Sequence, residues 1–143
     1  MRTLALLTAL ALTTPLATAA GPDLAPALAA KAGHERYRLA LAAQRGADNP
    51  AESAGHADPQ VAAAAIDAAR ERIADSGDNP SPGTEHIALA LLDFAAGKGV
   101  DAALAARAVH AVAESRCPFG GKASARISGL ALDPASPVRL DDI

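Results

Sequence analysis

The sequence predicts an all-α protein, a small bundle of about four to five helices that ends in an irregular segment or a short β-hairpin. Alanine, the strongest helix former, occupies 40 of the 143 positions, which favours helices over strands. Aromatic residues make up only 2% of the chain, and the β-branched residues that favour strands are also scarce. Apolar residues recur at helical spacing in several segments, so composition and pattern predict the same class.

The first 20 residues have the layout of a secretory signal peptide. Arg2 gives a positive start, a short apolar run follows, and small residues at positions 17–19 form a cleavage site. We therefore expect an exported protein, periplasmic or extracellular, whose mature chain begins near Ala20 or Gly21. The apolar run is too short to span a bilayer and no later segment is suited to it, so no integral membrane segment is predicted.

Charge and composition restrict the partners of the chain. The formal net charge is −3, and no basic patch is present to neutralise phosphates, which argues against binding to nucleic acid. The scarcity of aromatic residues also removes the usual stacking platforms for bases. The alanine-rich composition is typical of GC-rich bacteria and indicates a bacterial origin.

After the signal peptide, residues 21–57 are predicted to form an N-terminal helical arm and a linker. Residues 24–44 favour two short helices or one kinked helix, because Gly33 interrupts the apolar face. Residues 45–59 are rich in Gly, Ala, Asp, Asn and Pro without periodicity, and we expect a mobile linker there.

A helical core is predicted over residues 58–117, and its first helix covers residues 61–74. Asp58 is a good N-cap and Pro59 suits the first helical position. The predicted inner stripe consists of Ala62, Ile66, Ala69 and Ile73, and the predicted outward residues are Asp67, Arg70, Glu71 and Asp75.

The second core helix is predicted over residues 84–94, after a turn rich in proline. Thr84 is expected to be its N-cap, and Glu85 places negative charge at the positive end of the helix dipole. Apolar residues cover most of its circumference, so we expect this helix to be central to the bundle. We predict three core residues at positions i, i+4 and i+7 of this helix: Ile87, Leu91 and Phe94.

Asp101 is expected to cap a third core helix that ends near residue 116, because Pro118 cannot continue it. The C-terminal segment, residues 118–143, begins with a glycine-rich turn. Residues 124–132 and 137–140 are interpreted as two short strands or as an extended tail.

The segment GTEHIALALL at residues 83–92 resembles the G-T-E-H-(I/L)-L-L-(A/G)-L-(L/I) signature of the Clp chaperone N-terminal repeat. An alanine-rich helix with a charged outer face precedes it, and a glycine-containing turn and a further helix follow, as in the repeat. The resemblance covers roughly residues 58–115 in one copy and implies an all-helical module. It also implies that Glu85 and His86 help to lock the start of the helix.

In that family the repeat docks adaptors or substrates at the front of an ATP-driven unfoldase and has no chemistry of its own. The present chain departs from the family in three respects. It carries one clear copy of the repeat, no G-x-x-x-x-G-K-[ST] loop follows, and the predicted export places it where ATP-dependent Clp machines do not work. The resemblance therefore implies the fold and not the role in an unfoldase.

Cys117 is the single cysteine, so a disulfide within the chain is impossible. The first interpretation of Cys117 is a buried small residue, and the second is a cysteine that forms a disulfide-linked dimer. A mixed metal site formed by His86, His110 and Cys117 is a weaker hypothesis, because their spacing matches no short ligand motif. Catalysis by Cys117 is weaker still, because a helix C-terminus raises the pKa of a thiol.

We rank three hypotheses for the function. The first is non-enzymatic binding of a protein or peptide in a groove bordered by the three core helices, with no cofactor. The second is an exported protein that binds a metal or a small ligand through His86, His110 and Cys117. The third is an exported enzyme, which the absence of G-x-S-x-G and H-E-x-x-H motifs disfavours.

Overall fold

The computed structural model describes residues 21–79, 81–115 and 122–139. Every regular element in these ranges is a helix, which confirms the all-α class. In chain order the elements are α2 (Ala25–Ala29), α3 (His34–Arg45), the 3₁₀ helix η2 (Pro50–Gly55), α4 (Pro59–Asp75), α5 (Pro82–Ala95), α6 (Ala102–Ala113) and α7 (Lys122–Leu132).

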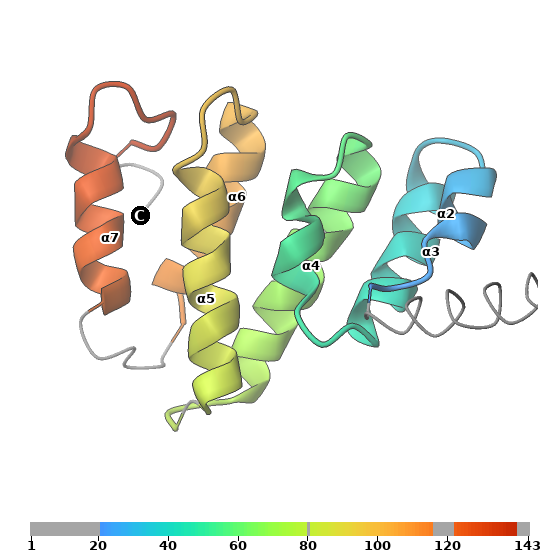
Figure 1. Ribbon diagram of the computed structural model, residues 1–143, viewed down its shortest axis with the longest axis horizontal. Coiled ribbons are helices and arrows are strands. Elements are labelled where there is room, and N and C mark those ends of the chain that lie inside the picture. Colours follow the sequence, from blue (N-terminus) through green and yellow to red (C-terminus); the bar gives the residue numbers. More distant parts are fainter. Residues whose placement is uncertain (1–20, 80, 116–121, 140–143) are drawn as a thin grey trace, which may run out of the picture.

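The helices follow one another across the molecule, from α2 and α3 at one end to α7 at the other (Figure 1). Helices α4, α5 and α6 pack on one another in the middle, α3 packs on α4, and α7 packs on α5 and α6. The arm over residues 24–44 is two helices, one of the two predicted forms. Gly33 separates them in a backbone conformation with φ 106°, which L side chains rarely adopt.

Helix α4 is central to the fold, and it belongs to both hydrophobic clusters. Ile66 and Ile73 join the main cluster with α5 and α6, and Val61 and Ala64 join a smaller one with α2 and α3. Helix α5 is central to the main cluster, as predicted, because it packs on α4, α6, α7 and η2, with Leu91 buried and Phe94 packed against the core. The small alanine side chains of α4 allow helices to approach it from several sides, which apolar periodicity alone does not reveal.

Two predicted helix starts are confirmed. Asp58 caps α4, where its Oδ1 accepts hydrogen bonds from the backbone N–H groups of Gln60 at 2.9 Å and Val61 at 3.4 Å. Asp101 caps α6 and accepts from the N–H of Leu104 at 3.1 Å. All three bonds satisfy N–H groups that a helix start leaves unpaired.

The predicted cap of α5 requires a correction. Ser81 is the N-cap, and its Oγ accepts a hydrogen bond from the N–H of Thr84 at 3.2 Å. Pro82 occupies the first helical position, where its fixed φ and missing N–H are no disadvantage, so the helix begins earlier than predicted. Thr84 is the third helical residue and is buried, and Glu85 lies in the first turn as predicted.

The prediction of a mobile linker over residues 45–59 is also corrected by the structure. It contains η2, whose first turn is capped by Asn49, because the side chain of Asn49 accepts from the N–H of Ala51 at 3.1 Å. Pro50, Ala51 and Ala54 are buried, and η2 packs on α4 and α5. Three small residues on one side of a short helix are enough to fill the space, a pattern too short for periodicity to detect.

The C-terminal segment is also corrected, since residues 124–132 belong to α7 and not to a strand. Ala123 and Leu130 are buried, and Ile127 packs against the main cluster. These apolar residues recur at helical spacing, and α7 packs on α5 and α6. Val138 is buried in the same cluster, beyond a turn that follows α7. The other predicted strand extends to residue 140, which lies outside the described residues.

Candidate functional site

A carboxylate on α4 forms a polar site between three helices. Asp67 is only 8% exposed and accepts hydrogen bonds from Arg107 on α6, from Nε to Oδ1 at 2.9 Å and from Nη2 to Oδ2 at 2.5 Å. The hydroxyl of Tyr37 on α3 donates to the same carboxylate. The prediction that Asp67 faces solvent was wrong, because α3 and α6 cover this side of α4.

The environment of Asp67 favours a structural role. Both of its oxygens bind donors from neighbouring helices, so a carboxylate that would be costly to bury alone is satisfied within the fold. Burial and the hydrogen bond to Asp67 raise the pKa of the Tyr37 hydroxyl. The cluster therefore cross-links α3, α4 and α6. Sequence analysis missed it because the alanine-rich segment around Asp67 gives no sign of which helices flank it.

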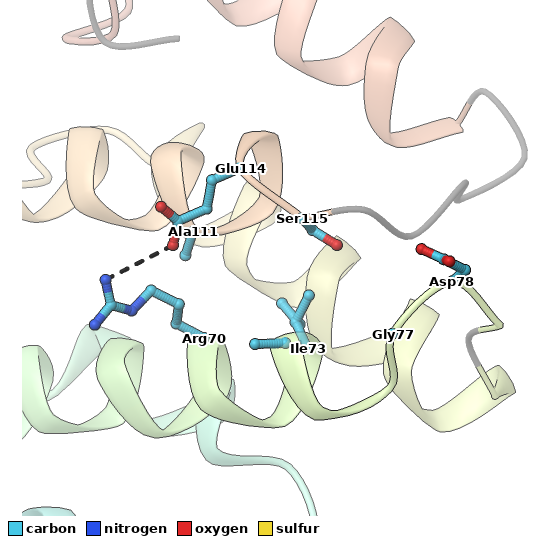
Figure 2. Close-up of a pocket in the computed structure, with 8 residues that line it drawn as sticks. Arg70, Ile73, Gly77, Asp78, Ala111, Glu114 and Ser115 are labelled. Atoms are coloured by element: carbon cyan, nitrogen blue, oxygen red, sulfur yellow. Dashed lines mark ion pairs between the residues drawn. The ribbon is translucent and has the colours of Figure 1, made fainter.

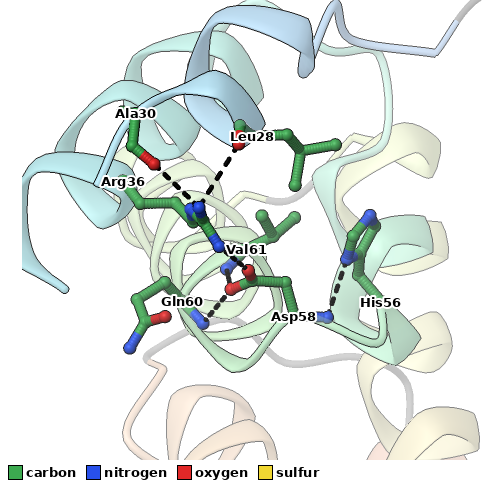
Figure 3. Close-up of polar contacts among 7 residues, drawn as sticks. All are labelled: Leu28, Ala30, Arg36, His56, Asp58, Gln60 and Val61. Carbon is green, nitrogen blue, oxygen red and sulfur yellow. Dashed lines mark hydrogen bonds and ion pairs between the residues drawn. The ribbon is translucent and has the colours of Figure 1, made fainter. Parts of the chain in front are cut away.

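A second polar network ties the N-terminal arm to the start of α4 (Figure 3). Arg36 on α3 donates from Nη1 to the Asp58 carboxylate at 2.6 Å. Its Nη2 donates to the backbone carbonyls of Ala30 at 2.7 Å and Leu28 at 3.3 Å, at the end of α2. One guanidinium therefore joins α2, α3 and the cap of α4.

An open cleft of about 520 Å³ lies between the C-terminal ends of α4 and α6, and we call it the α4–α6 cleft (Figure 2). Its apolar part includes Ile73 and Ala111, whose exposed fractions are 1% and 2%. Its charged side chains come from both helices and from the turn after α4. The lining residues are Arg70, Ile73, Ala74, Gly77, Asp78, Ala111, Glu114 and Ser115.

The ion pairs at the α4–α6 cleft join side chains that are about half exposed. Arg70 Nη1 lies 3.6 Å from Glu114 Oε1, and the two side chains are 51% and 40% exposed. The other oxygen of Glu114 lies 3.2 Å from Nε2 of His110. Because the two helices end at this cleft, their carbonyl ends add partial negative charge to that of Asp78 and Glu114.

A larger cleft, of about 780 Å³, lies at the opposite ends of the same helices. It is lined by η2, the start of α4, the end of α5 and the start of α6, with partly buried apolar side chains from Phe94, Val100 and Leu104. Asp93 beside it pairs with Arg126 on α7, and Asp101 is the cap of α6. The carboxylates of Asp93 and Asp101 therefore already have partners within the protein.

The predicted metal ligands are not brought together as a group in the part of the chain that the structure describes. His86 on α5 and His110 on α6 are both exposed, and Cys117 lies outside the described residues. Within the described ranges, no group of three or more His, Cys, Asp or Glu side chains is placed to hold a metal ion. The remaining histidines make local contacts, since His34 stacks on Tyr37 at 6.5 Å between ring centroids and Nδ1 of His56 accepts from the N–H of Asp58 at 3.0 Å.

Comparison with known proteins found no matching family model, no matching curated protein and no matching solved structure. Among the described residues, no helix is long and apolar enough to cross a membrane. The resemblance to the Clp N-terminal repeat therefore depends on residues 83–92 and their flanks, and it stays a prediction.

Proposed function

We propose that this protein is an exported, non-enzymatic helical module that binds a protein or peptide partner in the α4–α6 cleft. The observation that carries the proposal is the cleft itself, which combines the exposed Ala74 and the buried apolar residues Ile73 and Ala111 with a charged rim. Its volume of about 520 Å³ lies in the range of sites that accept side chains or small ligands.

Four features of the chain support this reading. The first 20 residues have the pattern of an export signal, and residues 83–92 resemble a repeat whose role is docking. The carboxylates of Asp58 and Asp67 are candidates for acid–base groups by residue type, but both form ion pairs with arginines of neighbouring helices. At the cleft, the side chains of Arg70 and Glu114 are about half exposed and are accessible to a partner.

The test is photo-crosslinking from the cleft in the producing organism. A photo-reactive residue replaces Ala74, which is exposed and lines the cleft, and the control carries it at Ala42, which is exposed on α3. We expect a discrete adduct from position 74 that is absent from position 42. Equal adducts from both positions, or none from position 74, would refute a partner in this cleft.

Native mass spectrometry separates this proposal from the alternative of a metal or small-ligand protein that uses His86, His110 and Cys117. We expect the mature chain to have its bare mass when purified from the envelope or the medium. A stoichiometric metal or small molecule that is lost from a His86→Ala/His110→Ala variant would replace the proposal with the alternative.

A further inference from the structure

We infer that the α4–α6 cleft receives a cationic side chain, lysine or arginine, from a basic segment of the partner. The inference rests on the proposed function and names the chemistry of the partner at the same site. Its basis is the charge of the lining residues together with the direction of the two helices that end there.

The electrostatic field of the cleft favours a cation. Among the described lining residues, Asp78 and Glu114 supply two carboxylates against the one guanidinium of Arg70, and α4 and α6 both present their carbonyl ends. Asp78 is exposed, and no ion pair engages it within the described residues. The chain after α4 turns at Gly77, whose φ of 61° lies in the left-handed region, and this turn positions Asp78 beside the cleft.

The basic residues that the structure describes near these helix ends do not remove this preference. Arg72, in the last turn of α4, donates to the backbone carbonyls of Arg45 at 3.1 Å and Ala47 at 2.6 Å, and so it serves the junction with α3. Arg70 approaches Glu114 only to 3.6 Å, and both side chains are about half exposed, so their ion pair is weak. The contact of Glu114 with His110, at 3.2 Å, also joins two exposed side chains, so Glu114 can approach a further cation without loss of a buried contact.

The apolar part of the cleft suits the rest of such a side chain. Lysine and arginine carry methylene stems that lie along apolar surface while the charged head reaches polar partners. Ala74 provides exposed apolar surface in this cleft, and the buried Ile73 and Ala111 lie beneath it, between the two helices (Figure 2). A hydrophobic residue would offer no ion pair to Asp78, and an acidic one would be repelled by Asp78 and Glu114, so the cleft discriminates by charge.

The test uses a short alanine-based peptide with one central arginine, and its citrulline analogue, which has the same shape without the charge. Each is titrated to millimolar concentration into the ¹⁵N-labelled protein while amide chemical shifts are followed. We expect shifts concentrated in residues 70–78 and 111–115, and about two- to fivefold tighter binding of the arginine peptide, the range of a partly exposed ion pair. High salt should remove most of the difference.

The matched variants are Asp78→Asn/Glu114→Gln at the cleft and Glu35→Gln/Glu52→Gln on α3 and η2, which remove the same charge from exposed positions elsewhere. The first pair should abolish the preference for arginine and the second should leave it intact. Equal binding of the two peptides, or no binding of either, would overturn the inference. If both peptides bind equally and Ala74→Trp blocks them while Ala42→Trp does not, the cleft is a peptide site without charge selectivity and the proposed function stands.

Discussion

Arg107 on α6 holds Asp67 on α4 in a two-pronged ion pair across 40 positions of sequence, with N–O distances of 2.9 and 2.5 Å. The Tyr37 hydroxyl completes the arrangement from α3. Three helices thus meet at one carboxylate, at the border between the two hydrophobic clusters that share α4. Because alanine buries little apolar surface, such polar cross-links carry a larger share of the specificity of this fold than they would in a leucine-rich bundle.

We predict that Asp67→Ala lowers the free energy of unfolding by about 2 to 3 kcal/mol. Hydrogen bonds to a charged group contribute about 1.5–3 kcal/mol each, and the value is at the low end here because Arg107 is 47% exposed and can rehydrate. Urea denaturation measures the change. The control Asp93→Ala removes an exposed pair with Arg126 and should cost less than about 1 kcal/mol. Equal losses for the two variants would contradict a special role for Asp67.

The cap of α5 gives a second prediction. Ser81→Ala should cost about 1 kcal/mol, because the N–H of Thr84 loses the hydroxyl that accepts its hydrogen bond. Ser81→Asp retains an acceptor and adds favourable charge at the helix start, so its stability should stay close to that of the wild type. Thermal unfolding of the three proteins checks this, and a stable Ser81→Ala variant would show that the cap is dispensable.

Acidification should loosen the N-terminal arm. Partial burial acts to raise the pKa of Asp58, but the hydrogen bonds from Arg36 and from the start of α4 outweigh it and lower the pKa below 3.8. The hydrogen bond from Arg45 lowers the pKa of Glu71 below 4.5. A lowered folded-state pKa stabilises the protein above the ordinary value, and this stability is lost as pH falls through the folded-state value.

We therefore expect the free energy of unfolding to decline below about pH 4.5. Asp58→Asn keeps a capping side chain but loses the charge that binds Arg36, so it should be less stable at neutral pH and decline less in acid. Urea denaturation between pH 3 and pH 7 compares the two proteins. Parallel pH profiles would exclude Asp58 as a source of the acid sensitivity.

Tyr37 offers a direct measurement, because it is the only tyrosine of the chain. Burial and the hydrogen bond to Asp67 raise its pKa above 10.0, so the protonated hydroxyl adds stability below pH 10.0 that is lost as pH rises through the folded-state value. The near-ultraviolet absorbance of tyrosinate should titrate later in the folded protein than in urea. Asp67→Asn removes the carboxylate charge and should move the folded-state titration back towards the unfolded one. An unchanged titration in that variant would leave burial as the sole cause.

If the protein is exported as proposed, its signal peptide is removed. Mass spectrometry of the protein from its own host should find an N-terminus near Ala20 or Gly21. Leu7→Arg places a charge in the apolar run and should leave the precursor uncut in the cell, whereas Thr13→Ser should be processed normally. Recovery of an intact N-terminus from the wild-type protein would refute the signal peptide.

The elements that sequence analysis predicted well are those fixed by neighbours along the chain. Asp58 and Asp101 cap their helices through N–H groups two or three residues away, so a short pattern is enough to identify them. Ser81 and Thr84 both precede the same apolar run, and Thr84 was predicted as the N-cap. Pro82 suits the first helical position, so α5 begins directly after Ser81. The C-terminal helix was missed because its few apolar residues are compatible with either period over so short a segment.

The sequence by itself determined the all-α class, the starts of α4 and α6, and the inner stripe of α4, because composition, caps and periodicity are local properties. Only the tertiary structure decided that α4 is central, that η2 packs into the core, that Asp67 is buried against Arg107 and Tyr37, and that the ends of α4 and α6 form a cleft. Each of these depends on which helices lie side by side. Side chains 30 or 40 positions apart meet only after the helices have packed, and the many interchangeable alanines do not encode that packing in any short pattern.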